Sequence, residues 1–378
     1  MVTLNDTLTA LTKRYGKVVV KSASDLAPAR RIRSEVPAYD YVSGGGYAVN
    51  RIIEHYGDYS SLKSYMAYIG IGKFQKYDWA NDVPDVIKGV SFKSSKSKSK
   101  DASLEDLMLK EISGVSLKRG YKPLKKPRVK RCVLIDIEGT YDKAWGEKLG
   151  IDNEALLYLQ PGSLNQAVDI AIALLSDDNI SLVVIDSMVA IGADAETDKS
   201  MEDNQMSVNA LFWNRATRNL QAAINRNPEN DITLICMNGY YDKVGVSFGN
   251  PEQVKNGKQF SLAKSVSVRF TPLKEIKVDD VTVGRNISLK NKKNKGGRQY
   301  MDVTLYFSYI DDGSVKAGTT DVTNQLIELG LKFEIIDRKG STYSYKDFSA
   351  VGMEKFKTKL EEDTETISNL KEEVYAKF

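Results

Sequence analysis

Residues 57–64 carry a pattern that can bind phosphate groups. An apolar stretch leads to Gly57, and five positions later Leu62 precedes Lys63 and Ser64. The pattern G-x-x-x-x-G-K-[ST] is matched except at Leu62, where it has glycine. Such a loop turns successive backbone N–H groups toward phosphates, and the N-terminus of the next helix adds its positive end. The sequence therefore predicts a nucleoside triphosphate site, with an ordinary strand-turn-helix as the alternative.

In such a site Lys63 would reach the β- and γ-phosphates, and the Ser64 hydroxyl would bind Mg²⁺. The residues expected to hold the nucleotide through this loop are Gly57, Asp58, Tyr59, Ser60, Ser61, Leu62, Lys63 and Ser64.

Two carboxylates follow at the ends of apolar segments. Asp186 comes directly after four apolar residues, and an acid at the tip of a buried strand is the usual holder of Mg²⁺ in P-loop NTPases. Glu138, in the segment IDIEG, can orient or deprotonate an attacking water. The alternatives are a helix-capping aspartate and a solvent-facing glutamate. The pair predicts hydrolysis of the triphosphate.

Regular alternation of strands and helices would position these groups. Short apolar strands that alternate with helices predict a parallel sheet covered on both faces, with ligands at the carboxyl ends of its strands. Glu138, Asp186 and Asn238 each end a predicted strand, so we expect them to converge beside the phosphate loop. The predicted strands lie at 51–56, 132–139, 181–187 and 232–238, and the predicted helices at 165–175 and 205–226.

The last third of the chain has a different pattern. From about residue 266, strand-like runs such as SVSVRF and MDVTLYFSY alternate apolar and polar residues. Residues 319–378 predict a mixed lobe, in which TDVTNQLIELGL is helical, STYSYKDF forms a hairpin edge, and one charged helix ends the chain.

Composition narrows the function classes. The chain has 378 residues, of which 42% are hydrophobic and 28% charged, as in an ordinary globular protein. No apolar run approaches the length of about 18 residues that a membrane span needs, so we expect no membrane partner. Cys132 and Cys236 lie in apolar runs and predict reduced thiols in the cytoplasm. The chain has a single histidine, His55, which argues against histidine-based catalysis and against a histidine-rich metal site.

Positive charge is concentrated in one segment. Residues 93–131 contain thirteen Lys or Arg against four Asp or Glu, although the whole chain carries only +4. Such a segment is either a solvated insertion or an arm that contacts nucleic-acid phosphates.

The order of these segments resembles the RecA family of ATP-dependent DNA strand-exchange recombinases. RIIEHYGDYSSLKS resembles the family's ATP loop, IDIEGTYDKAWGEKLGID its catalytic-glutamate segment, and LVVIDSMVAI its metal-aspartate strand. VGVSFGNPE resembles the second DNA-binding loop and is the most specific single match, while LTKRYGKVVV resembles the N-terminal helix and strand. The resemblance extends along the chain, except for an insertion at about 75–130.

The resemblance implies an α/β fold: a RecA-like P-loop ATPase core with a mostly parallel central sheet. The implied core covers 37–307 and includes the basic insertion at about 75–131. An N-terminal helix-strand oligomerisation arm would occupy 1–36, and a small α+β C-terminal lobe 308–378.

The resemblance also implies roles in an ATP and Mg²⁺ site. Glu138 would activate water, and Asp186 would support the metal beside Ser64. Asp142 and Trp145 fall where the family contacts adenine, and Tyr306 matches another adenine-side aromatic. Lys290 and Lys292 match a pair that reaches the γ-phosphate of the neighbouring subunit, where their charge stabilises the transition state. Without the resemblance, this lysine-rich stretch reads as a solvated basic turn.

Two further segments resemble DNA-binding loops, at 194–206 and 240–257. A basic groove with apolar insertions can bind single strands without reading their sequence. A mobile surface loop is the alternative for the second segment. The residues that the resemblance assigns to DNA are Met206, Arg218, Lys243, Val244, Gly245, Phe248, Asn250 and Lys258.

Several positions depart from the family pattern. Gly239 stands where cellular members have a glutamine that senses the γ-phosphate. Leu211 and Ser267 occupy positions that are basic in familiar members, and Lys258 and Lys264 are expected to compensate. Together with Leu62, these departures favour a divergent, phage-like member, located in the host cytoplasm if a phage encodes it.

The expected activity is ATP-dependent homologous recombination. Protomers would assemble head to tail into helical filaments on single-stranded DNA, pair it with double-stranded DNA and exchange strands, with DNA-stimulated ATP hydrolysis. A single-strand-binding or loader protein is a further expected partner. The alternatives are a non-hydrolysing ATP-dependent DNA-binding scaffold and a ring-forming helicase motor on the same core.

Overall fold

The structure, a computed structural model, describes residue 10 and residues 30–79, 130–188, 205–226, 231–242, 252–254, 257–311 and 315–378. The chain divides into two units, residues 1–28 with 78–129 and residues 29–77 with 130–378, and nearly all of the described residues belong to the second. Most of the expected N-terminal arm, of the basic insertion and of both expected DNA loops lies outside the described residues. The fold below is that of the second unit.

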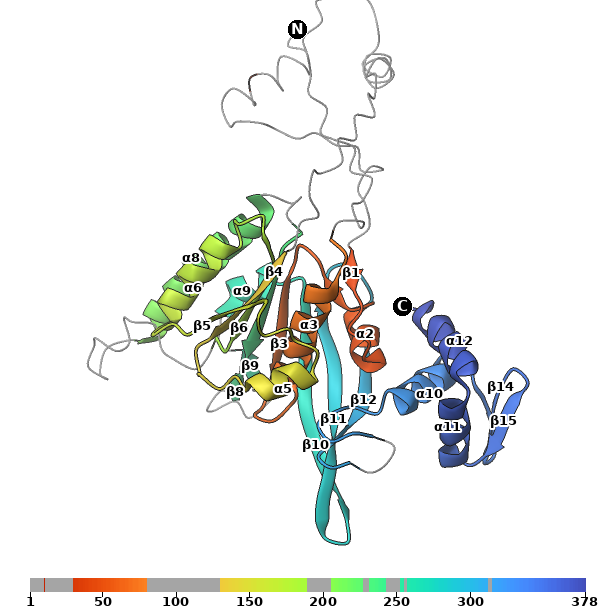
Figure 1. The fold of residues 1–378 in the computed structure, drawn as a ribbon. Helices are drawn as coiled ribbons and strands as arrows, with labels where there is room; N and C mark the ends of the chain where they lie inside the picture. The colour runs from red at the N-terminus through yellow and green to blue at the C-terminus, as the bar shows by residue number, and fades with distance from the viewer. Residues whose placement is uncertain are drawn as a thin grey trace, which may run out of the picture. The chain divides into compact units, whose positions relative to one another are not determined.

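An eight-stranded sheet forms the centre of this unit (Figure 1). Its six strands from β10 to β5 run parallel to one another, and β11 and β12 run antiparallel at one edge, which confirms the expected mostly parallel sheet. In spatial order the strands are β12 (Asp302–Ser308), β11 (Val281–Asn294), β10 (Val266–Val278), β3 (Ile52–Gly57), β7 (Thr233–Asn238), β6 (Ile180–Asp186), β4 (Arg131–Asp136) and β5 (Leu156–Leu159).

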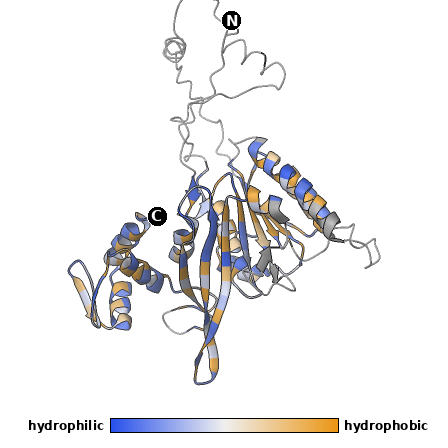
Figure 2. Cartoon of the chain, turned by 180° about the vertical axis from the view of Figure 1, so that it is seen from behind, coloured by the Kyte–Doolittle hydropathy of each residue, from blue (hydrophilic) through white to orange (hydrophobic). Residues whose placement is uncertain are grey.

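Helices cover both faces of the sheet. In β4, Val133 and Ile135 belong to an apolar core shared with α6 (Leu164–Leu174), α8 (Gln205–Arg226) and α9 (Gly257–Ala263). Cys132, the residue before Val133, points the other way, and its thiol donates to the carbonyl of Ile71 in α3 (Lys63–Lys76) at 3.7 Å. Because successive strand residues face opposite sides and helices cover both, the inner strands are mostly apolar, and orange predominates in them in Figure 2.

Two short helices and two small ribbons complete the core. Helix α2 (Pro37–Ser43) packs on the β10–β12 side of the sheet, and α5 (Lys143–Lys148) follows β4. The two-stranded ribbons are β1 (Arg31–Ile32) with β2 (Tyr47–Ala48), and β8 (Tyr240–Asp242) with β9 (Glu252–Val254). Among the described residues no helix is long and apolar enough to span a lipid bilayer.

The β10–β11 hairpin extends beyond its neighbours (Figure 1). Strand β3 pairs with β10 only from Val266 to Phe270, whereas β10 pairs with β11 out to Val278. The hairpin turns at Asp279 and Asp280, whose φ angles of 47° and 64° give the left-handed backbone that two-residue hairpin turns favour.

The C-terminal segment is a small α+β lobe, as expected. It contains α10 (Val322–Lys332), a three-stranded antiparallel sheet, α11 (Met353–Glu362) and α12 (Thr364–Tyr375). The strands are β13 (Asp337–Lys339), β14 (Thr342–Tyr345) and β15 (Phe348–Val351), and β14 with β15 is the predicted hairpin. The single terminal helix of the prediction is wrong: Asp363 separates two helices and caps the second by accepting from the backbone N–H of Thr366 at 3.0 Å.

Candidate active site

The phosphate-loop segment joins β3 to α3 at the carboxyl edge of the parallel strands. Gly57 ends β3, and α3 begins at Lys63. A Cβ atom on Gly57 would collide with the backbone carbonyl oxygen of Phe270 in β10, so only glycine allows the loop to leave the sheet here. The loop therefore starts from a position fixed by backbone packing.

Leu62 adopts the conformation that glycine would have at this position. Its φ and ψ of 71° and 17° are left-handed, and it forms the N-cap of α3. A left-handed conformation costs a non-glycine residue roughly 1–2 kcal/mol. The departure from the sequence pattern thus changes a side chain and adds strain, while the backbone of the loop keeps a glycine-like turn before Lys63.

The ammonium group of Lys63 lies inside the loop. Its Nζ donates to the carbonyl of Gly57 at 3.0 Å and to Ser61 Oγ at 3.2 Å, and it also contacts the carbonyl of Asp58. Burial lowers the pKa of Lys63, an effect that the nearby carboxylates of Asp186 and Asp58 oppose. A partly buried cation held by neutral carbonyls is well placed to exchange them for phosphate oxygens.

Ser64 and Asp186 meet at the centre of the site. Ser64 Oγ donates to Asp186 Oδ2 at 3.1 Å, which joins the first turn of α3 to the end of β6. Burial, followed by the negative charge of Glu138, raises the pKa of Asp186 to about 7. The structure thus brings together the two residues expected at the metal.

Glu138 is exposed in the loop after β4, and two polar groups orient it. Its Oε1 accepts from Ser187 Oγ at 2.7 Å. Asp136 is fully buried and accepts from the backbone N–H groups of Gly139 and Tyr141, each at 2.9 Å, on the two sides of the turn. The sequence analysis did not select Asp136 or Ser187. For Asp136 there was a signal, an acidic residue two positions before the glutamate.

A hydroxyl and a carboxylate suit magnesium. Mg²⁺ prefers oxygen ligands and usually takes one or two carboxylates together with substrate phosphates. Ser64 and Asp186 offer such oxygens, and Glu138 adds negative charge nearby. Within the described ranges no group of three or more His, Cys, Asp or Glu could hold a metal by itself. The residues therefore fit a metal that arrives with a phosphate ligand.

The expected adenine-side residues lie at two different elements, α5 and β12. Asp142 caps α5 by accepting from the backbone N–H of Trp145 at 2.6 Å. The indole of Trp145 lies against Gly318, where a Cβ atom would overlap it. Tyr306 donates its hydroxyl to the carbonyl of Val283 at 3.3 Å, within the β11–β12 pairing.

The residue after Tyr306 faces the phosphate-loop helix instead. Phe307 is buried, and its ring packs edge-on against Tyr65, next to Ser64, with centroids 5.2 Å apart. Adjacent strand residues point to opposite faces, so Tyr306 does not share this contact. Phe307 is therefore the aromatic of β12 on the α3 side, and the adenine-side role expected of Tyr306 stays a prediction.

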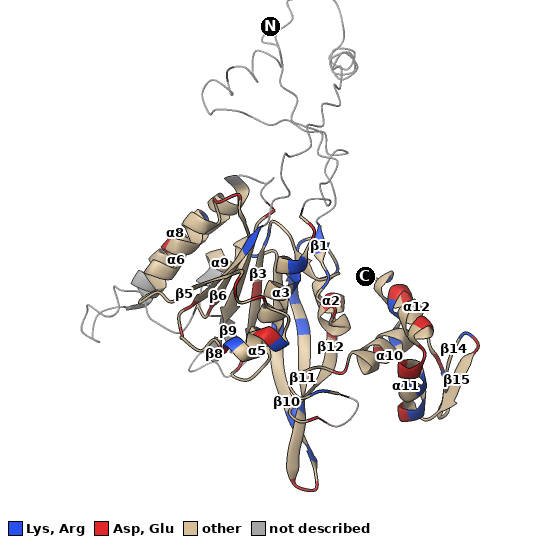
Figure 3. Cartoon of the chain, viewed as in Figure 1, with Lys and Arg blue, Asp and Glu red and all other residues tan. Residues whose placement is uncertain are grey.

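The two lysines expected to act across a subunit interface lie on β11, a strand on which Figure 3 shows Lys and Arg positions in blue. Lys290 is exposed and stands opposite Arg269 of β10 in the strand register, while Lys292 is half-buried. Their expected partner belongs to a second protomer, so this role stays a prediction.

The expected DNA-binding residues are described only in part. Arg218 is exposed on α8, where its Nε donates to the carbonyl of Asn214 at 3.2 Å. Met206 and Lys258 belong to α8 and α9, but their side chains are not described. Lys243, Val244, Gly245, Phe248 and Asn250 lie outside the described residues.

Lys264 does not compensate for missing basic residues in a DNA groove. It is 6% exposed and forms an ion pair with Glu54, which is fully buried in β3. Glu54 also accepts from Ser267 Oγ at 2.5 Å and from Asn238 Nδ2 at 3.0 Å. Asn238 thus turns toward this buried group, while Glu138 and Asp186 converge beside the loop.

Comparison with known proteins agrees with this geometry. The model of the RecA N-terminal domain family matches residues 124–313, about half of the chain. Protein RecA of Francisella philomiragia subsp. philomiragia is 30% identical over 367 residues, which cover 96% of this chain and 85% of that protein. The chain belongs to the RecA family. Membership identifies it broadly as a recombinase of the class that pairs and exchanges homologous DNA.

Two further similarities accompany this family match. Protein RecA of Rickettsia conorii is 33% identical over 239 residues, 63% of this chain and 66% of that protein. The crystal structure of the RadB recombinase aligns with a TM-score of 0.45 and 14% identity over 72% of this chain and 94% of that one. The second similarity is too remote to define details of this RecA-family site.

Proposed function

We propose that this RecA-family chain is an ATP-dependent homologous recombination protein that forms helical filaments on single-stranded DNA and hydrolyses ATP when DNA is bound. The observation that carries the proposal is the cluster of Lys63, Ser64, Asp186 and Glu138 at one edge of the sheet. Its hydrogen bonds join three separate segments of the chain into a site with the charges that a triphosphate and its metal require.

Each residue has a role in this proposal. Lys63 and the loop N–H groups bind the phosphates, and the N-terminus of α3 adds its positive end. Ser64 and Asp186 would hold Mg²⁺, which when bound neutralises charge on the phosphate oxygens. Glu138 takes a proton from the attacking water at one carboxylate oxygen, while Ser187 holds the other oxygen.

The subunit interface is the second part of the proposal. Tyr59 in the phosphate loop is 95% exposed, so this side of the site is open within one protomer. Lys290 and Lys292 of a neighbouring protomer would close it and stabilise charge on the γ-phosphate. Head-to-tail repetition of this contact gives an open helical filament. Unpaired, buried Cys132 and Cys236 support a cytoplasmic location.

Electron microscopy and strand exchange test this proposal together. Purified protein with ATP, Mg²⁺ and single-stranded DNA should form filaments and exchange a strand with homologous duplex, and the Lys63→Ala variant should do neither. Filaments without phosphate release would favour the scaffold alternative, and closed rings that unwind DNA would favour the helicase. Either result, or no DNA-dependent assembly by the wild type, would overturn the proposal.

A further inference from the structure

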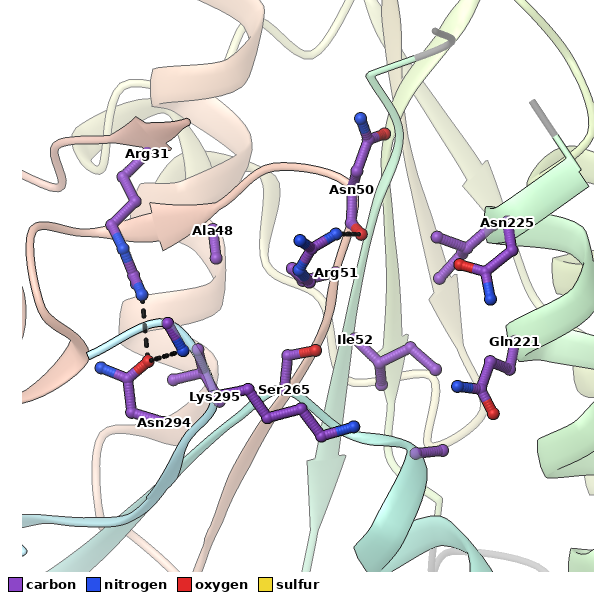
Figure 4. A pocket seen from close by; sticks show the side chains of 14 residues that line it. Arg31, Ala48, Asn50, Arg51, Ile52, Gln221, Asn225, Ser265, Asn294 and Lys295 are labelled. Atoms are coloured by element: carbon purple, nitrogen blue, oxygen red, sulfur yellow. Dashed lines mark hydrogen bonds between the residues drawn. The ribbon is translucent and has the colours of Figure 1, made fainter. Parts of the chain in front are cut away.

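A basic pocket opens at the amino-terminal ends of the parallel strands, at the end of the sheet opposite to the phosphate loop (Figure 4). It lies where β3 and β10 begin, between the end of β11 and the last turns of α8, and its volume is about 280 Å³. Sites for drug-sized ligands begin at about 300 Å³, so this slightly smaller pocket suits only a compact ligand. Because the candidate active site lies at the carboxyl ends of the parallel strands, this pocket is separate from it.

The charged residues known to line the pocket are all positive. Arg31, Arg51 and Lys295 line it, and none of the described residues that line it is Asp or Glu. The carboxylate of Asp231, near the lining residue Asn50, is already paired with Arg30. Three cations with no carboxylate among the described lining residues repel one another, and a bound anion would relieve that repulsion.

Arg31 is a fixed wall of this pocket. Its guanidinium donates to the carbonyls of Ser43 at 2.6 Å and Gly46 at 3.3 Å, and to Asn294 Oδ1 at 3.0 Å. Burial lowers the pKa of Arg31, and the positive charge of Arg51 lowers it further. These hydrogen bonds hold a positive charge in place before any ligand arrives, so the site is preorganised for an anion.

Two other cations have donors to spare. Arg51 makes one hydrogen bond, to the carbonyl of Asn50 at 2.9 Å. The side chain of Lys295 makes no hydrogen bond or ion pair with any residue that the structure describes. A guanidinium and an ammonium together bind phosphate oxygens well, since the planar guanidinium can donate two parallel bonds.

The opposite wall offers neutral polar groups. Gln221 and Asn225 lie four residues apart on α8, so they share one face of the helix, and Figure 4 shows both beside the pocket. Neither side chain is hydrogen-bonded in the part of the chain that the structure describes. Paired amides can both donate to and accept from a base or a sugar.

We propose that this pocket binds a small phosphorylated molecule of nucleotide size, with its phosphate on Arg51 and Lys295 and its polar organic part on Gln221 and Asn225. A cavity with amides on one wall favours a compact ligand over a DNA backbone, which would lie along an open basic surface. The site is independent of the proposed recombinase activity.

Calorimetric titration of the full chain with adenosine monophosphate tests the site, with a non-hydrolysable ATP analogue saturating the candidate active site. The wild type should bind one equivalent. The Arg51→Gln/Lys295→Gln double variant should bind about tenfold more weakly or worse, because two charge-assisted hydrogen bonds are lost. A matched control, Lys355→Gln/Lys377→Gln, removes two exposed lysines from the C-terminal lobe and should bind as the wild type does.

A second double variant tests the amide wall of the pocket separately from the basic wall. Gln221→Leu/Asn225→Leu should weaken binding of adenosine monophosphate and leave binding of inorganic pyrophosphate unchanged. Thermal unfolding of every variant should match the wild type, since the substituted side chains are exposed. No heat with the wild type, equal affinity in the arginine–lysine variant, or loss only of oligonucleotide binding in that variant would each overturn the proposal. Lys295→Gln alone repeats the test with the smallest structural change.

Discussion

The hydroxyl of Ser64 and the carboxylate of Asp186 are 3.1 Å apart, although the residues are 122 positions apart in the sequence. Ser64 lies in the first turn of α3, and Asp186 ends β6, which is two places from β3 in the sheet. Parallel strands deliver their carboxyl ends to one edge, so a helix start and a strand end meet there. This contact links the loop that resembles a phosphate site to the acid that resembles its metal holder.

The left-handed backbone at Leu62 predicts opposite effects for two substitutions. Leu62→Gly should leave the protein as stable as the wild type or about 1 kcal/mol more stable, because glycine adopts this conformation without strain. Leu62→Val should cost about 1–2 kcal/mol, because a β-branched residue tolerates positive φ poorly. Urea denaturation measures both changes. Equal stability of the two variants would contradict the account of this turn.

Asp136 is predicted to act as a positioning residue for Glu138. Asp136→Asn loses a charged acceptor for two backbone N–H groups beside the glutamate, so turnover should fall about 10–100-fold with little change in ATP affinity. Steady-state kinetics with separate values of kcat and KM measures this split. Tyr158→Phe, which removes one hydroxyl bond of 3.1 Å to the same carboxylate, should have a smaller effect. A rise in KM alone for Asp136→Asn would contradict this role.

The buried pair Glu54–Lys264 is predicted to be strongly coupled. Glu54→Gln and Lys264→Met should each cost about 3–5 kcal/mol, because each leaves an uncompensated buried charge. The double variant should cost less than the sum of the two. Chemical denaturation gives all three values. As a control, breaking the more exposed Arg285–Glu275 pair should cost about 0–1 kcal/mol. Additive effects of the two substitutions at Glu54 and Lys264 would contradict the coupling.

His55 predicts a pH dependence of folding stability. Burial lowers its pKa from 6.5 to about 3 in the folded chain, while Tyr39 shares a hydrogen bond of 2.8 Å with its Nε2. The unfolded chain takes up the proton first, so this group's contribution to stability falls as the pH drops from about 6.5 toward 3, by up to about 1.4 kcal/mol per pH unit.

The variant His55→Gln isolates that contribution. Asp40 works in the opposite direction: burial raises its pKa to about 6, so its contribution to stability decreases as the pH rises from about 4 to 6. Subtracting the pH profile of His55→Gln from that of the wild type removes the Asp40 effect. The difference should slope upward between pH 4.5 and 6.5; a flat difference would show that His55 is protonated in the folded chain.

The sheet and the central residues of the site were predictable from sequence because their signals are local. The ends of four apolar strands could be recognised in the sequence, and in an α/β sheet the polar groups of a site lie at the strand ends. The role of Asp136 was not predictable in this way, since its bonds to the following turn depend on backbone geometry. The contact of Phe307 with α3 was not predictable either, because it depends on which face of β12 meets α3, and one residue of register reverses it.

Lys264 shows the limit of charge patterns. A lysine near a predicted DNA loop was expected to face DNA, yet it neutralises a glutamate on another strand. A buried charge is stable only with its partner, and the partner lies 210 residues away in sequence. Its environment follows from the strand order, which composition does not reveal.

The central claim is that Ser64, Asp186 and Glu138 form a working ATPase site that DNA stimulates. Phosphate release at saturating Mg²⁺, with and without single-stranded DNA, tests it in the wild type, Ser64→Thr and Ser64→Ala. Release should rise with DNA in the wild type and in Ser64→Thr, which keeps the hydroxyl, and should fall about tenfold or more in Ser64→Ala. Equal rates in Ser64→Ala and the wild type, or wild-type release no greater than that of Lys63→Ala, would contradict it.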